Sequence, residues 1–171
     1  MIPLVLVLTT LVFRALGALG VRRFATWPAS AAHGMAVMLL FTASAHFVPA
    51  EVTAMPNHAD MVRMVPPFLP FADALVYLTG VLELLGAAGL VITATRWAAG
   101  YALAALFVAL LPANIHAAVA DVPFAGGEAT PLWQRIPEQI LYLAVAVWVA
   151  RTATTRAPLA NHAEPKENVY S

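Results

Sequence analysis

One carboxylate, Glu83, lies in the middle of an apolar stretch that runs from residue 71 to residue 93. A charged side chain alone in hydrocarbon costs roughly 3 kcal/mol or more, so Glu83 should face protein or water and have a partner. Gly80, Glu83, Gly86 and Ala87 share one face on helical spacing, which places the carboxylate where a neighbouring helix can approach closely. Such a carboxyl group suits proton exchange, and a single structural hydrogen bond between helices is the plainer interpretation.

The composition predicts an all-α membrane protein. Of the 171 residues, 61% are hydrophobic and 11% are charged, whereas charged residues make up about a quarter of a soluble domain. Five apolar stretches are long enough to be transmembrane helices, at residues 2–20, 29–47, 71–93, 98–120 and 132–150. A net charge of zero without long basic runs argues against nucleic-acid binding, and the lack of cysteine excludes dithiol chemistry.

Two polar groups near the ends of neighbouring stretches could meet the carboxylate. His46 closes the second stretch and shares a helical face with Thr42, four residues earlier. Asn114 follows Pro112, which should kink the fourth stretch, and its amide offers two donors and one acceptor. His116 points the other way on a regular helix, so Asn114 is expected to face the interior. A solvated capping residue is the ordinary alternative for His46.

The start of the fifth stretch adds Arg135 and Gln139, which lie one above the other on a helix. They could contribute to the same polar site, although an arginine at a helix end also anchors readily at lipid headgroups.

Residues 50–70 are too polar and too rich in proline to span a membrane. Residues 58–65 predict one or two turns of amphipathic helix at the interface. Pro66 and Pro67 then form a stiff apolar turn, which we expect to cover the mouth of the site as a lid.

This organisation predicts an extra N-terminal transmembrane helix in residues 1–24, a four-helix membrane bundle in residues 25–151 and a disordered tail in residues 152–171. The positive-inside rule orients the chain, because most basic residues fall on one side of a five-span topology. That side should be cytoplasmic, with the N-terminus outside and the tail inside. The cytoplasmic group is Arg22, Arg23, Arg96, Arg151, Arg156 and Lys166, and the outer group is Arg63 and Arg135.

Several short motifs together resemble the DoxX-like family of small bacterial integral membrane proteins. They are AHFVP at residues 45–49, MVPPFLP at 64–70, LTGVLELLG at 78–86, LPANIH at 111–116, and RIP at 135–137 with Gln139. The resemblance covers roughly residues 33–150 and implies a four-helix bundle in the bacterial inner membrane. Members of that family are associated with quinone-linked chemistry, and relatives also serve as partners of redox enzymes or as assembly factors.

Two functions therefore compete. In the first, the chain is a quinone-associated accessory subunit: Glu83 exchanges protons, and the ligand is bound by His46, Asn114, Arg135, Gln139, Pro66 and Pro67. The electrons would come from a membrane redox enzyme, since the sequence contains no flavin, nucleotide or haem motif. In the second, the chain is a non-catalytic scaffold or assembly factor, and association of several copies is compatible with both. A metal site formed by His46, Glu83 and His116 is a weaker alternative, because the three are scattered along the chain.

Overall fold

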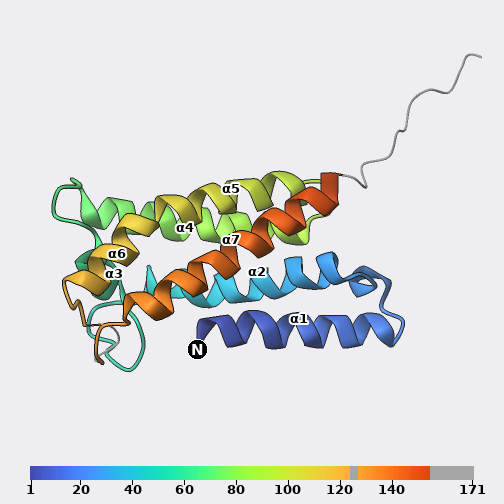
Figure 1. Ribbon diagram of the computed structural model, residues 1–171, viewed down its shortest axis with the longest axis horizontal. Helices are drawn as coiled ribbons and strands as arrows, with labels where there is room; N and C mark the ends of the chain where they lie inside the picture. The colour runs from blue at the N-terminus through green and yellow to red at the C-terminus, as the bar shows by residue number, and fades with distance from the viewer. Residues whose placement is uncertain (124–126, 155–171) are drawn as a thin grey trace, which may run out of the picture.

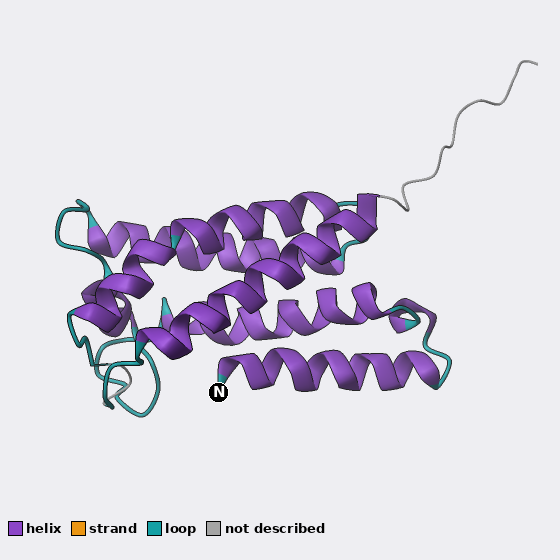
Figure 2. Cartoon of the chain, in the orientation of Figure 1, coloured by secondary structure: helices purple, strands orange, loops and turns teal. Residues whose placement is uncertain are grey.

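The computed structural model describes residues 1–123 and 127–154, which fold into helices joined by loops (Figure 2). The tail was predicted to begin at residue 152, but residues 152–154 belong to the last helix, and residues 155–171 lie outside the described residues. The elements are α1 (Ile2–Ala18), a 3-10 turn η1 (Arg22–Phe24), α2 (Trp27–Ala45), α3 (His58–Met64), α4 (Ala72–Val91), α5 (Arg96–Ala109), α6 (Leu111–Val119) and α7 (Leu132–Thr154). The described part of the chain contains no strand, so the all-helical prediction is confirmed.

Three helical segments are long and apolar enough to cross a membrane. They are α2, α4 and the combined stretch of α5 and α6 from Arg96 to Val119. The first helix, α1, is apolar but has 17 residues, or about 26 Å of helix, compared with about 30 Å of hydrocarbon in a bilayer. The 23 residues of α7 are sufficient in length, but the helix carries Arg135, Glu138 and Arg151.

Four of the long helices form a closed ring of contacts. α2 contacts α4, α4 contacts α5, α5 contacts α7, and α7 returns to α2. α1 packs against α2 from outside this ring, so that it lies beside α2 in Figure 1. The close approach of α1 depends on Gly34, because a Cβ atom at that position would lie 2.3 Å from the hydroxyl oxygen of Thr10.

α2 is the most enclosed helix, and α4 has one inward face. Two thirds of the apolar window of α2 is buried (67%), compared with one third (33%) for α4. The buried residues of α4 are Val76, Gly80, Glu83, Gly86, Ala87 and Leu90, which confirms the face expected from helical spacing. Beyond Asp73 and Tyr77 near its start, the residues that α4 exposes are apolar and include Leu78, Val81, Leu82 and Leu85, as expected for a helix bordered by lipid.

At the end of the molecule where α4 finishes, two arginines bind its last carbonyl groups. Arg96 Nε donates to the Leu90 carbonyl at 2.8 Å, and Arg23 Nη2 donates to the Val91 carbonyl at 3.2 Å. The last turn of a helix leaves carbonyls without intrahelical partners and carries partial negative charge, so arginine is well suited to this position. Arg23 also donates from Nε to His33 Nε2 at 2.9 Å, which ties α4 to the first turns of α2.

The other end of the molecule is closed by α3 and α6 (Figure 1). α3 begins with a capping box, in which the Asn57 side chain accepts from the Asp60 amide at 3.1 Å and the Asp60 carboxylate accepts from the Asn57 amide at 3.2 Å. Met64 on the apolar side of α3 packs against Ala117 and Val122. The short amphipathic helix predicted from the sequence is therefore confirmed, and it contacts both α4 and α6.

Pro112 lies in the first turn of α6, directly after the break that separates α6 from α5. Proline cannot donate to the preceding turn, which explains why the helix is interrupted here, as expected. The break lets α6 bend toward α3, while α5 continues to pack against α4 and α7.

Candidate functional site

Glu83 is buried, with 5% of its surface exposed, and it meets two side chains from the C-terminal end of α2. Thr42 Oγ1 donates a hydrogen bond of 2.6 Å to Glu83 Oε2. The Nε2 atom of His46 lies 3.6 Å from Glu83 Oε1. The structure thus brings together two of the residues proposed from the sequence, Glu83 and His46, across the contact between α2 and α4.

The hydrogen-bonding pattern determines which nitrogen of His46 can exchange a proton with Glu83. His46 Nδ1 is 2.7 Å from the Val76 carbonyl oxygen, which can only accept, so Nδ1 carries a hydrogen. One proton held by either Nε2 or Oε1 makes their contact at 3.6 Å attractive. That proton is bound either to nitrogen, giving an imidazolium and a carboxylate, or to oxygen, giving two neutral groups. Both forms have zero net charge, which limits the cost of burying the pair.

A glycine on α4 makes room for the histidine. A Cβ atom at Gly80 would lie 2.6 Å from the Cβ atom of His46, well inside contact distance. Thr79 Oγ1 lies 3.4 Å from His46 Nδ1 and donates to the Val76 carbonyl at 3.0 Å. The imidazole is therefore held against the main chain of α4, and its free edge is directed at Glu83.

Thr42 is the partner of Glu83 that sequence reasoning did not include in the site. Its spacing of four residues from His46 places both side chains on one face of a helix. That face was the available signal, because a hydroxyl group one turn before a candidate histidine can reach the same carboxylate. What the sequence does not show is which helix faces that of Glu83.

Asn114 and Arg135 form a second polar group. Arg135 Nη1 donates to the Asn114 side-chain oxygen at 3.0 Å, and Arg135 Nε donates to the Thr130 carbonyl at 2.9 Å. Asn114 in turn donates from its side chain to the Leu110 carbonyl at 3.1 Å, which also accepts from the Asn114 backbone amide. This group links α6 to α7, whereas the Glu83 pair links α2 to α4. His116, which was expected to point away from Asn114, contacts the carbonyl of Met64 on α3 through Nδ1 at 3.1 Å, whereas Asn114 contacts α7.

The inner face of α7 carries two buried polar atoms beyond Arg135. Gln139 Oε1 and the hydroxyl oxygen of Tyr142 are both enclosed, and neither has a hydrogen-bond partner in the part of the chain that the structure describes. Tyr142 is 7% exposed, and its ring lies 5.9 Å from that of Phe107. Leaving such a group unpaired costs about 1–3 kcal/mol, so both atoms would gain from a hydrogen-bonding ligand or water. Tyr142 is a further candidate that sequence reasoning missed.

The two prolines expected to cover the site differ in environment. Pro66 is among the most completely buried side chains, whereas Pro67 is exposed. Neither proline lines the cavity at this end of the molecule, whose walls are the segment after α2, the helix α3 and the first turns of α4. Phe68 and Phe71, which follow the prolines in the chain, are exposed over 77% and 81% of their surfaces.

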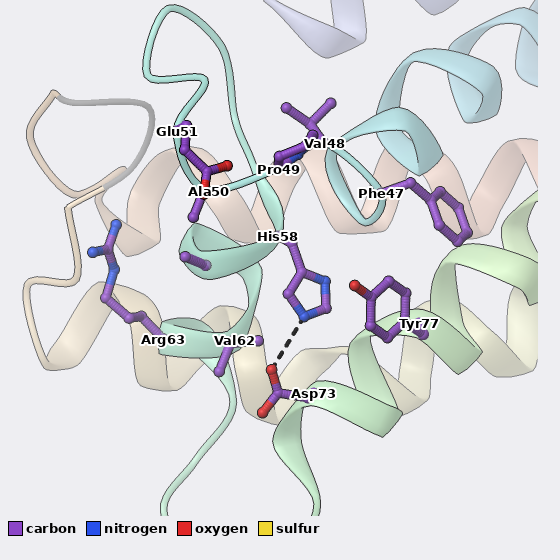
Figure 3. Close-up of a pocket in the computed structure, with 11 residues that line it drawn as sticks. Phe47, Val48, Pro49, Ala50, Glu51, His58, Val62, Arg63, Asp73 and Tyr77 are labelled. Carbon is purple, nitrogen blue, oxygen red and sulfur yellow. Dashed lines mark hydrogen bonds and ion pairs between the residues drawn. The ribbon is translucent and has the colours of Figure 1, made fainter.

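A cavity of about 600 Å³ lies between the segment after α2, α3 and the start of α4 (Figure 3). Its walls include Phe47, Glu51, His58, Arg63, Asp73 and Tyr77. His58 Nε2 lies 3.3 Å from Asp73 Oδ1, and the imidazole stacks on the ring of Tyr77 with centroids 4.1 Å apart. His58 also donates from Nδ1 to the main-chain carbonyl of His46 at 2.8 Å, so the cavity wall is bonded directly to the residue that faces Glu83.

Within residues 1–123 and 127–154, no group of three or more histidine, aspartate and glutamate side chains is arranged to hold a metal ion. His116, one of the three residues of the metal alternative, contacts a carbonyl of α3 instead.

Comparison with protein families places the chain in one of them. Residues 35–150 match the family described as a domain of unknown function, DUF8561, and the chain belongs to that family. The matched region begins within α2 and ends within α7, so it contains every residue of the Glu83 pair and of the Asn114 group. No curated protein and no solved structure matches the chain.

Replacement of Thr42 by valine should destabilise the protein, because Glu83 Oε2 loses its donor while the shape of the side chain is nearly kept. We expect a loss of about 1–2 kcal/mol in the free energy of unfolding, measured by denaturant titration in detergent micelles. Ser44→Ala is the matched control, since Ser44 donates to the Phe41 carbonyl of its own helix. Equal stability of Thr42→Val and Ser44→Ala would contradict the assigned role of Thr42.

Proposed function

We propose that this DUF8561 member is a DoxX-like integral membrane protein that serves as a quinone-associated accessory subunit of a membrane redox system. In this proposal α1, α2, α4, α7 and the combined α5 and α6 cross the bacterial inner membrane as five spans. α2, α4, α5 and α7 form the membrane bundle, and α1 is an additional span outside it. The ring of helix contacts and the exposed apolar face of α4 support this arrangement.

The observation that carries the proposal is the contact of Glu83 with His46, which brings an acid and a base together among apolar helices. Reduction of a quinone to a quinol consumes two electrons and two protons. The partner redox enzyme supplies both electrons. The pair gives one proton to the reduced ring, regains one from the aqueous side and gives the second in the same way. A buried acid and base whose shared proton can lie on either atom is suited to this exchange.

The ring of the quinone is bound through its carbonyl oxygens. Tyr142 would donate its hydroxyl hydrogen to one of them, since that hydroxyl is buried and has no partner in the described residues. Asn114, Arg135 and Gln139 would orient the other side of the ring from α6 and α7. The prolines of the segment after α3 would limit access to the site, with Pro66 packed inside and Pro67 at the surface.

The alternative function is a non-catalytic scaffold or assembly factor. It is favoured by the fact that Glu83 already has two partners within the chain, which is what a purely structural polar contact requires. The exposed aromatic side chains of Phe68, Phe71 and Trp133 would then be available to a partner protein.

The proposed quinone site predicts that the purified protein binds a short-chain quinone analogue, measured by calorimetry and by the shift in thermal unfolding temperature. Tyr142→Phe should weaken that binding about tenfold, because one hydrogen bond of about 1.4 kcal/mol is lost. Tyr101→Phe is the control, since Tyr101 is exposed on α5. A wild-type protein that binds no analogue would remove the quinone proposal.

Glu83→Gln separates the two functions. The amide keeps the size of the side chain and both of its contacts, so the variant should fold with a free energy of unfolding within about 1 kcal/mol of the wild type. The quinone proposal expects loss of quinone-linked electron transfer in membranes that contain the partner enzyme. The scaffold alternative expects normal activity, and that result would favour it.

The proposed orientation can be tested with introduced cysteines, because the natural chain has none. Ala54→Cys lies in the loop before α3, and Ala94→Cys lies between α4 and α5 beside the arginine-rich end. By the positive-inside rule, a membrane-impermeant maleimide added to intact spheroplasts should label position 54 and leave position 94 unlabelled until the cells are lysed. Labelling with the opposite pattern would reverse the orientation.

A further inference from the structure

The pair of His58 and Asp73 repeats the chemistry of the pair of His46 and Glu83. In both pairs, Nδ1 of the histidine contacts a main-chain carbonyl oxygen, at 2.8 Å for His58 and at 2.7 Å for His46. In both pairs, Nε2 faces a carboxylate, at 3.3 Å for His58 and at 3.6 Å for His46. Because each carbonyl requires a hydrogen on Nδ1, Nε2 of each histidine is the nitrogen that can exchange a proton with the carboxylate.

The two pairs form a spatial series that leads from the surface to the interior. The carbonyl that His58 contacts belongs to His46 itself. The exposed fraction of the side chain falls along the series, from 78% for Asp73 through 15% for His58 and 8% for His46 to 7% for Glu83. The outer carboxylate is therefore in contact with water, while the inner one is enclosed.

Figure 3 shows the outer pair at the wall of the cavity, with His58 between Tyr77 and Asp73. The other charged groups of this wall are Glu51 and Arg63, which come from the loop after α2 and from α3. Arg63 is paired with the buried carboxylate of Asp60, so its charge is balanced within α3. Tyr77 contributes the ring on which His58 stacks.

We infer that the pair of His58 and Asp73 is the proton-exchange site that connects water to the buried pair of His46 and Glu83. This inference rests on the proposed function, because it names the residues that recharge Glu83. A proton from water binds at the outer pair, and one proton passes on to Nε2 of His46 or to Oε1 of Glu83. No electron moves in this step, and the outer pair recovers its original state when it takes the next proton from water.

The His46 carbonyl lies between the two imidazoles and cannot itself carry the proton. Transfer between the rings occurs when the bond from His58 Nδ1 to that carbonyl opens and water of the cavity takes its place. His58 stays close to its position during this opening, because Tyr77 supports one face of the ring and Asp73 holds Nε2. The cavity of about 600 Å³ beside His58 has ample volume for the water involved.

The experiment follows the proton on Glu83 by infrared spectroscopy of the full-length protein in lipid nanodiscs. The carbonyl stretching band of the protonated Glu83 carboxyl is identified across a pH series as the band that Glu83→Gln lacks. Its rate of hydrogen–deuterium exchange is then measured after transfer to deuterated buffer. Asp73→Asn should slow that exchange about tenfold or more, because the exposed base is lost.

Two further variants make the result specific. Glu51→Gln removes a carboxylate from the same cavity wall and should leave the exchange rate unchanged. His58→Asn keeps a side-chain N–H near the position of Nδ1, so it can still contact the His46 carbonyl, but it cannot carry an additional proton. It should slow exchange as Asp73→Asn does while the thermal unfolding temperature stays close to that of the wild type.

The outcomes separate this inference from the proposed function. If Asp73→Asn and His58→Asn exchange at the wild-type rate, the outer pair is not the entry site, and the quinone proposal is unaffected. Slowing by Glu51→Gln to the same extent would also overturn the inference, because the effect would then reflect the charge of the cavity. If the wild type has no Glu83 band at any pH at which it stays folded, the proton stays on His46 and Glu83 never carries it, so both proposals, which name Glu83 as the proton-exchanging group, fall together.

Discussion

The structure depends on one electrostatic constraint, which is that a carboxyl group buried among apolar helices must be neutralised locally. Glu83 meets this constraint with a hydroxyl donor from Thr42 and with the imidazole of His46, whose Nε2 lies 3.6 Å from the carboxyl group. A lone ion in hydrocarbon would be far less favourable than this neutral pair. The constraint fixes the register between α2 and α4, because both partners lie in the last turn of α2 and just beyond it, and the carboxyl group lies in the middle of α4.

Small residues allow that register to form. Gly80 lets α4 approach the Cβ atom of His46, and Gly86 lies where a Cβ atom would come within 2.4 Å of the Leu103 side chain on α5. The same face of α4 therefore contacts α2 and α5 through glycine and displays its carboxyl group between them. The opposite face remains apolar and exposed, which is the division expected when lipid rather than water surrounds a helix.

Sequence periodicity was sufficient to predict the helices and the inward face of α4, because apolar spacing and proline breaks are local properties. It also located the short helix near residues 58–65, whose Asn57 and Asp60 have the spacing of a capping box. The contact of His58 with Asp73 could not be predicted in this way, since it depends on the path of a loop between two helices. Thr42 and Tyr142 were missed for a related reason: their polar atoms matter only once the facing helix is known.

In both histidines the tautomer is set by a main-chain carbonyl rather than by a side chain. Every amino acid supplies that carbonyl, so substitutions at Val76 would leave the imidazole of His46 oriented as long as α4 remains helical. The carboxylates that face Nε2 belong to side chains, so a single substitution can remove them. Substitutions of the carboxylates among homologues should therefore change the acidity of these two sites. The orientation of each imidazole, with Nε2 as its reactive nitrogen, should be kept.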